Sequence, residues 1–187
     1  MRRATTVFPV AVVLVALTAA PTGAGMVLKL DLAGLEERAH TIFRGTVLSV
    51  EPGTVTAGGA EISTVTYRLS VDEAFKGDWP KGIAEITMLG TLKEQDAGGT
   101  YVHLSHLPEL PNLVRGGEYV LFTNAPSPTT GLSSTIGLGQ GAFKIYLSAE
   151  RQEMAANQLD NAGLSPAIND PVTYATLADA IRQQVGQ

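Results

Sequence analysis

The ten-residue segment from Thr64 to Glu73 constrains the fold of this chain more than any other feature. Apolar side chains at Val65, Tyr67, Leu69 and Val71 alternate with polar ones. Successive side chains of a β-strand point to opposite faces, so this segment has one apolar and one polar face. Such a pattern is typical of a half-buried strand in an antiparallel sheet, and it predicts a mainly β protein.

Further strands are expected where β-branched and aromatic residues gather between turn signals. They cover residues 41–50, 83–89, 100–104, 118–123 and 135–147. Pro52-Gly53 is expected to end the first strand, with Gly58-Gly59 in a flexible connection. Phe75-Lys76-Gly77-Asp78 is interpreted as a turn, and residues 90–99 and 125–133 as loops.

Three helices are expected. The first spans residues 31–40 and is capped by Asp31. The second spans residues 148–161. The third follows the cap signal Asp170-Pro171 and places Tyr174, Leu177, Ile181 and Val185 on one face, because they recur at helical spacing.

Five or six antiparallel strands leave too much apolar surface for an open sheet. Curling into a small barrel of the OB (oligonucleotide/oligosaccharide-binding) type buries it. We therefore expect an OB-like β-barrel domain over residues 25–147 and a helical C-terminal extension over 148–187, packed on the barrel. A single core needs no metal or disulfide at this length.

Residues 1–24 have the pattern of a cleavable signal peptide. Arg2 and Arg3 precede an apolar run from Val7 to Ala20, and small residues lead to a cleavage point after Ala24. The apolar run is shorter than the roughly 20 residues that span a bilayer. We expect export to the periplasm or the medium, without stable membrane insertion after cleavage.

Charge and cysteine content exclude several classes of function. The chain has 13 basic and 18 acidic residues, and loss of Arg2 and Arg3 with the signal leaves 11 basic ones. Such an acidic domain lacks the clustered Lys and Arg that bind nucleic acid. The absence of cysteine excludes thiol catalysis and cysteine-based zinc sites.

Several short segments resemble a known family when taken in order. They are Ile42 to Val47, Tyr67 to Val71 with Phe75-Lys76-Gly77, and Gly116 to Phe122. Their order after a helix resembles the netrin-like domain, the OB-type barrel of tissue inhibitors of metalloproteinases, and a group of uncharacterised bacterial secreted proteins. The resemblance covers residues 31–147 and implies a protein-binding barrel.

The chain departs from those inhibitors at the N-terminus. Their mature N-terminal cysteine presents its amine and carbonyl to the protease zinc and is held by disulfides. Here cleavage after Ala24 leaves Gly25-Met26-Val27, with no cysteine to hold the segment. This departure puts inhibition by that mechanism in doubt.

His103 and His106 form the most site-like pair, with Glu94, Asp96 and Glu109 near them in sequence. A spacing of three places the two side chains on opposite faces of a strand, so ordinary loop histidines are the favoured interpretation. His40 is expected to complement the end of the first helix. Gly137, Gly139 and Gly141 are interpreted as barrel-bend glycines rather than a phosphate loop.

Lys76 and Trp79 are expected to be exposed near one barrel end, with Trp79 capping its mouth or anchoring a partner. Glu36-Glu37-Arg38 is interpreted as a solvated helix face.

We expect an exported, non-enzymatic binding module that recognises a protein. In the most specific version of this hypothesis, the partner is an exported metalloprotease. Recognition is expected in the loops around residues 51–61 and 91–116. No catalytic residue, metal ligand or cofactor is assigned. The alternatives are a metal-dependent hydrolase that uses His103 and His106, and a structural cell-envelope component.

Overall fold

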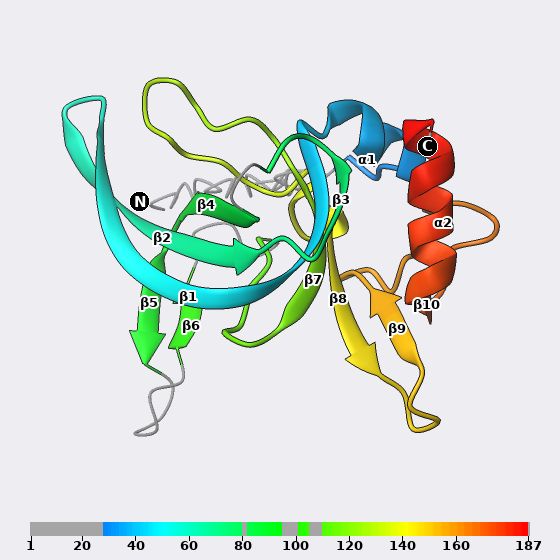
Figure 1. Ribbon diagram of the computed structural model, residues 1–187. Helices are drawn as coiled ribbons and strands as arrows, with labels where there is room; N and C mark the ends of the chain where they lie inside the picture. The colour runs from blue at the N-terminus through cyan, green and yellow to red at the C-terminus, as the bar shows by residue number, and fades with distance from the viewer. Residues whose placement is uncertain (1–27, 80–81, 95–100, 105–109, 187) are drawn as a thin grey trace, which may run out of the picture.

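The computed structural model describes residues 28–79, 82–94, 101–104 and 110–186 (Figure 1). The predicted signal peptide, residues 1–24, lies outside the described residues. In chain order the elements are α1 (Leu32–Arg38), β1 (Thr41–Ala57), β2 (Ala60–Ser70), β3 (Glu73–Lys76), β4 (Ile83–Leu89), β5 (Thr91–Glu94), β6 (Tyr101–Leu104), β7 (Glu118–Thr123), the 3-10 helix η1 (Leu138–Gly141), β8 (Ala142–Leu147), β9 (Glu153–Ala156), β10 (Val172–Thr173) and α2 (Tyr174–Val185).

The protein is mainly β, as predicted, and its strands pair antiparallel. The main sheet has eight strands in the order β10-β9-β8-β7-β1-β2-β4, with β3 paired to β1. A separate two-stranded sheet contains β5 and β6. The main sheet thus has more strands than the five or six expected, and its described pairings do not close it.

The long strand β1 joins two different environments. Its first part pairs with β7 along one edge, from Thr41 to Thr46, and with β3 along the other. Its second part pairs with β2 and forms a hairpin arm that extends away from the helices (Figure 1). Along the described chain, no strand pairs with the remaining edge of β1 beyond Thr46.

The prediction that Pro52-Gly53 ends this strand is wrong, because β1 continues to Ala57. Proline has no backbone N–H to donate. An edge strand tolerates it, because one side of such a strand has no neighbouring strand to receive a hydrogen bond. The connection at Gly58-Gly59 is a two-residue hairpin turn in which φ is 59° and 80°. Positive φ at both positions suits the strand twist and favours glycine. The segment 51–61 is therefore a strand hairpin rather than a loop.

The sheet is buried on both faces where β1 and β7 pair. Ile42, Val120 and Phe122 belong to a helix-side core with side chains of α1 and α2. Their chain neighbours Phe43 and Leu121 belong to an inner core with β2 and β4 residues such as Tyr67. Alternate side chains of the same strands therefore fill two cores, one under the helices and one inside the curl of the sheet.

The helix predicted over residues 148–161 is wrong. The chain turns after Leu147 and returns as β9, which pairs with β8. Asn157 and Asn161 then hold a tight turn, because each side-chain oxygen accepts the other residue's backbone N–H at 2.9 Å. Such side-chain bonds to the backbone compete with helix formation. The C-terminal segment therefore extends the sheet before it becomes helical.

The two remaining helices agree with the sequence pattern. The Asp31 carboxylate accepts the Gly34 N–H at 2.8 Å and caps α1 as predicted. The last helix begins at Tyr174 and is capped by Thr173, not by Asp170-Pro171. Its predicted buried face is confirmed at Tyr174, Leu177 and Ile181. Within the described ranges, no helix has the length and apolar character needed to cross a membrane.

Candidate functional site

The histidine pair is only partly within the described residues. His103 lies in β6, where its backbone pairs with Leu92. His106, Asp96 and Glu109 lie outside the described residues, so a site built on the two histidines stays a prediction. Elsewhere in the described chain, no three His, Asp or Glu side chains are placed to hold a metal ion.

The side chain of Lys76 is not the free surface group that we expected. Its ammonium donates to the Glu36 carboxylate at 2.9 Å and to the Glu36 carbonyl at 2.8 Å. The pair ties β3 to α1, so Glu36 is more than a solvated helix residue.

Trp79 and His40 lie beside one hollow. Trp79 is partly buried and its ring meets Phe43 of the inner core edge-on, with the centroids 4.7 Å apart. Its indole N–H is buried and has no acceptor among the described residues. His40 is exposed and follows Ala39, the C-cap of α1.

The glycines at 137, 139 and 141 lie in and beside a short 3-10 turn, η1, between the bridge at Thr135 and strand β8. The strand predicted over residues 135–147 therefore begins only at Ala142, as β8, and these glycines form a turn before it rather than a bend within it. A Cβ atom at Gly139 would lie 1.8 Å from the Oε1 atom of Gln158, so glycine is needed for Gln158 to pack there.

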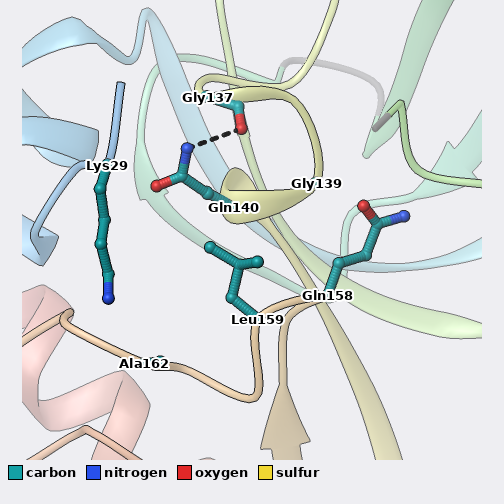
Figure 2. A pocket seen from close by; sticks show the side chains of 7 residues that line it. All are labelled: Lys29, Gly137, Gly139, Gln140, Gln158, Leu159 and Ala162. Carbon is teal, nitrogen blue, oxygen red and sulfur yellow. Dashed lines mark hydrogen bonds between the residues drawn. The ribbon is translucent and has the colours of Figure 1, made fainter. Parts of the chain in front are cut away.

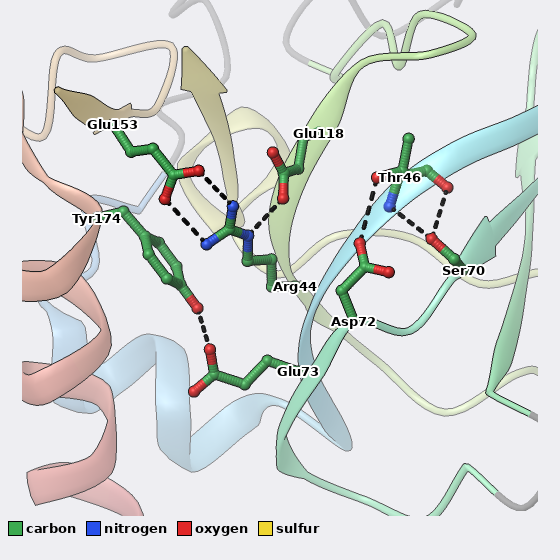
Figure 3. Close-up of polar contacts among 8 residues, drawn as sticks. All are labelled: Arg44, Thr46, Ser70, Asp72, Glu73, Glu118, Glu153 and Tyr174. Atoms are coloured by element: carbon green, nitrogen blue, oxygen red, sulfur yellow. Dashed lines mark hydrogen bonds and ion pairs between the residues drawn. The ribbon is translucent and has the colours of Figure 1, made fainter. Parts of the chain in front are cut away.

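The first notable polar group is the Arg44 cluster, which contains Arg44, Glu73, Glu118, Glu153 and Tyr174 (Figure 3), together with Arg182. The Arg44 guanidinium donates to Glu118 at 2.5 Å and to both oxygens of Glu153, at 2.8 and 3.2 Å. It also lies 4.0 Å from the centre of the Tyr174 ring, within the range of a cation–π contact.

The cluster continues through Tyr174. The Tyr174 hydroxyl donates to one oxygen of Glu73, and Arg182 donates to the other at 2.5 Å. These contacts connect α2 to β3, while Arg44 connects β1, β7 and β9. The Arg44 cluster therefore ties the C-terminal helix to the sheet.

The pKa directions agree with these contacts. Burial would lower the pKa of Arg44, but its bonds to Glu118 and Glu153 raise it overall above the ordinary value. Burial and the bond to Glu73 raise the pKa of Tyr174. Burial would raise the pKa of Glu73, yet the bonds from Tyr174 and Arg182 lower it overall. All three groups are held in their usual charge states at neutral pH, as suits a structural network.

Beside the cluster, Ser70 connects the end of β2 to β1 (Figure 3). Its hydroxyl accepts the Thr46 N–H at 3.2 Å, and the Thr46 hydroxyl donates to Asp72. A Cβ atom at Gly45 would lie 1.9 Å from the Ser70 carbonyl oxygen, so only glycine permits this close approach. These contacts hold the bend between β2 and β3.

The second group is a hollow of about 430 Å³ beside η1 (Figure 2). Lys29 lies on one side of it and Gln158 on the other, with Leu159 between them. The Gln140 side chain fixes the chain entering the hollow: its oxygen accepts the Leu30 N–H and its amide donates to the Leu28 carbonyl, both at 2.9 Å.

Two further hollows share walls with this one. A hollow of about 320 Å³ shares Gln158 and is lined by Lys144, Tyr146 and Val114. A hollow of about 450 Å³ shares Gly137 and is lined by Arg38 and Leu28. We call these three adjoining hollows the basic groove, because none of their lining residues is Asp or Glu while each hollow has one Lys or Arg.

The sequence predictions did not single out Lys29, Lys144 or Gln158. Of the two expected recognition segments, residues 91–116 contribute Pro111, Asn112 and Val114 to the groove, whereas the 51–61 hairpin lines none of its hollows. One sequence signal points to the groove: no acidic residue occurs between Glu118 and Glu150 in this acidic chain. That stretch contains η1 and β8, which supply part of the groove wall.

No protein-family model matches this chain, and no curated protein was found to match it.

Proposed function

We propose that this chain is an exported, non-enzymatic binding module that recognises a protein partner through the basic groove. The observation that carries the proposal is a concave surface free of carboxylates on an acidic chain. Exposed apolar side chains lie in it, with Val114 and Leu159 each 45% exposed and Tyr146 39% exposed. Concave surfaces with apolar walls and a few polar groups are where ligands usually bind.

The fold part of the proposal is an OB-like, partly open barrel, as the netrin-like resemblance implies. Its support is the strand order β4-β2-β1-β7-β8, which wraps the inner core. In addition, the Ser133 N–H donates to the Thr87 carbonyl at 2.8 Å, which brings the segment after β7 to β4 at the far end of the sheet. OB folds are partly open five-stranded barrels that bind ligands on their surface.

The test is affinity capture with the mature chain, residues 25–187, from the envelope fraction and culture fluid of the producing organism. The groove variant Val114→Asp/Leu159→Asp adds two carboxylates to exposed positions of the groove. The control variant Leu89→Asp makes a similar change on β4, where Leu89 is 36% exposed. We expect a partner that the wild type and the control retain and the groove variant loses. Equal capture by all three chains would contradict the proposal.

A narrower candidate is an exported metalloprotease as the partner. The observation that favours it is the hold of Gln140 on Leu28 and Leu30, which fixes the segment just after the expected mature N-terminus without a disulfide. We expect the mature chain to slow zinc proteases secreted by its own host, and Gln140→Ala to weaken the effect. Full protease activity at saturating mature chain would exclude this candidate and leave the binding module untouched.

A further inference from the structure

Basic side chains divide into two groups in the described part of this chain. Arg44, Arg68, Lys76 and Arg182 each have an acidic partner within 4 Å. Lys29, Arg38, Arg115, Lys144 and Arg151 have no ion-pair partner among the described residues. Of these, Lys29, Arg38 and Lys144 line the basic groove. Three of these five unpaired charges therefore lie in one concave region, whereas Arg115 and Arg151 line none of its hollows.

The surroundings strengthen this asymmetry. Two other hollows include carboxylates, Asp31 in one and Asp78 with Glu85 in the other. The groove includes none, although acidic residues outnumber basic ones in the chain. A cleft lined by one sign of charge focuses its field and attracts ligands of the opposite sign.

We infer that the basic groove binds an extended, acidic segment of a partner protein; this inference rests on the proposed function. The lysines Lys29 and Lys144 would pair with carboxylates of the segment, and the exposed side chains Val114 and Leu159 would contact its apolar residues. Tyr146 and Gln158 also line the groove and supply an aromatic surface and a side-chain amide.

Aliphatic walls favour a peptide over an acidic polysaccharide. Val114, Leu159 and Ala162 suit leucine or valine side chains, and Tyr146 is the one exposed aromatic lining residue on which a sugar ring stacks, because Tyr119 is buried. An anionic polysaccharide is therefore the competing outcome of the test.

The experiment measures fluorescence anisotropy with two labelled peptides and the purified mature chain. One peptide has leucines spaced among glutamates, and the other has glutamine in place of every glutamate. We expect the acidic peptide to bind about tenfold more tightly than the neutral one at low salt, with the difference shrinking as salt rises. Lys29→Gln/Lys144→Gln should weaken its binding by about tenfold or more, because charge-assisted contacts are the strong ones.

The matched control is Arg68→Gln/Arg151→Gln, which removes two positive charges outside the groove. Arg68 is exposed and forms a long ion pair with Glu85, at 3.8 Å, and Arg151 lies in the β8–β9 turn. Binding by this control should match the wild type. Circular dichroism of each variant checks that the fold is retained.

Three results would overturn the inference. Equal affinity for both peptides would show that the charge of the peptide does not contribute to binding. The capture experiment would still test the proposed function independently. An equal loss in the groove and control variants would show only an effect of net charge. Binding of polygalacturonate that depends on Lys29 and Lys144, without binding of the acidic peptide, would assign the groove to a polysaccharide. The proposed function fails separately, when the groove aspartates do not change capture.

Discussion

The Arg44 cluster and the basic groove use positive charge in opposite ways. In the cluster, Arg44 and Arg182 both meet carboxylates supplied by other strands or by their own helix. In the groove, Lys29, Arg38 and Lys144 face no carboxylate among the lining residues. Charges satisfied inside the fold stabilise it, whereas charges left unpaired in a hollow remain available to a ligand. Four predictions test this contrast.

The largest expected effect is on Arg44. Its side chain is only 15% exposed, so Arg44→Ala would leave Glu118 and Glu153 without their shared partner. We expect the free energy of unfolding to fall by about 2–3 kcal/mol, below the range for fully buried pairs because both glutamates retain some solvent. Urea denaturation measures the change. Arg68→Ala is the control and should cost under about 1 kcal/mol, since its pair with Glu85 is exposed. Equal losses would remove the distinction between cluster and surface charge.

A smaller effect is expected at Tyr174, where the hydroxyl and the ring act separately. Tyr174→Phe removes the hydrogen bond to Glu73 and keeps the ring beneath Arg44. We expect a loss of about 1–2 kcal/mol in the free energy of unfolding, near the low end for a bond to a charged group, because Glu73 keeps its bond from Arg182. Tyr174→Leu, which also removes the ring, should cost more. An unchanged Tyr174→Phe variant would show that the hydroxyl does not hold α2.

The cluster also predicts a pH dependence. Because the folded-state pKa of Glu73 lies below its ordinary value of 4.5, its contribution to stability is present above that pH. The contribution is lost as pH falls through the folded-state pKa, where the unfolded chain already binds the proton. Glu73→Gln should therefore narrow the difference in stability between pH 6 and pH 3, measured by thermal melts. A variant with the full wild-type pH dependence would place the acid-sensitive contacts elsewhere.

The smallest stability effect is expected in the groove. Lys29→Gln/Lys144→Gln removes two exposed charges that have no internal partner, so the free energy of unfolding should stay within about 0.5 kcal/mol of the wild type. The same denaturation experiment measures it. A loss comparable to that of Arg44→Ala would mean that these lysines serve the fold, which would weaken their assignment to a ligand.

Local patterns predicted much of the fold. The strands at 83–89 and 118–123 agree with β4 and β7, and the cap at Asp31 is confirmed. These elements are specified by alternation or capping within a few residues. The helix expected over 148–161 failed because its outcome depends on paired side-chain bonds of Asn157 and Asn161 and on strand pairing with β8. Long-range pairing of this kind leaves little trace in local periodicity.

The groove was harder to predict than the strands. Its lysines stand 115 positions apart in the chain, at Lys29 and Lys144, and only the fold brings their hollows together around Gln158. Neither lysine belongs to a motif with fixed spacing. The acid-free stretch between Glu118 and Glu150 was the available signal, and it became meaningful only once η1 and β8 were seen to form the groove wall.

The central claim is that ligand contact occurs at the unpaired charges and not at the paired ones. A ¹H–¹⁵N NMR titration of the mature chain with the glutamate-containing peptide tests it directly. We predict backbone shifts at Lys29, Lys144, Tyr146 and Gln158, with the amides of Arg44 and Tyr174 unchanged. Shifts confined to the β1–β2 arm or to the Arg44 cluster would contradict the account.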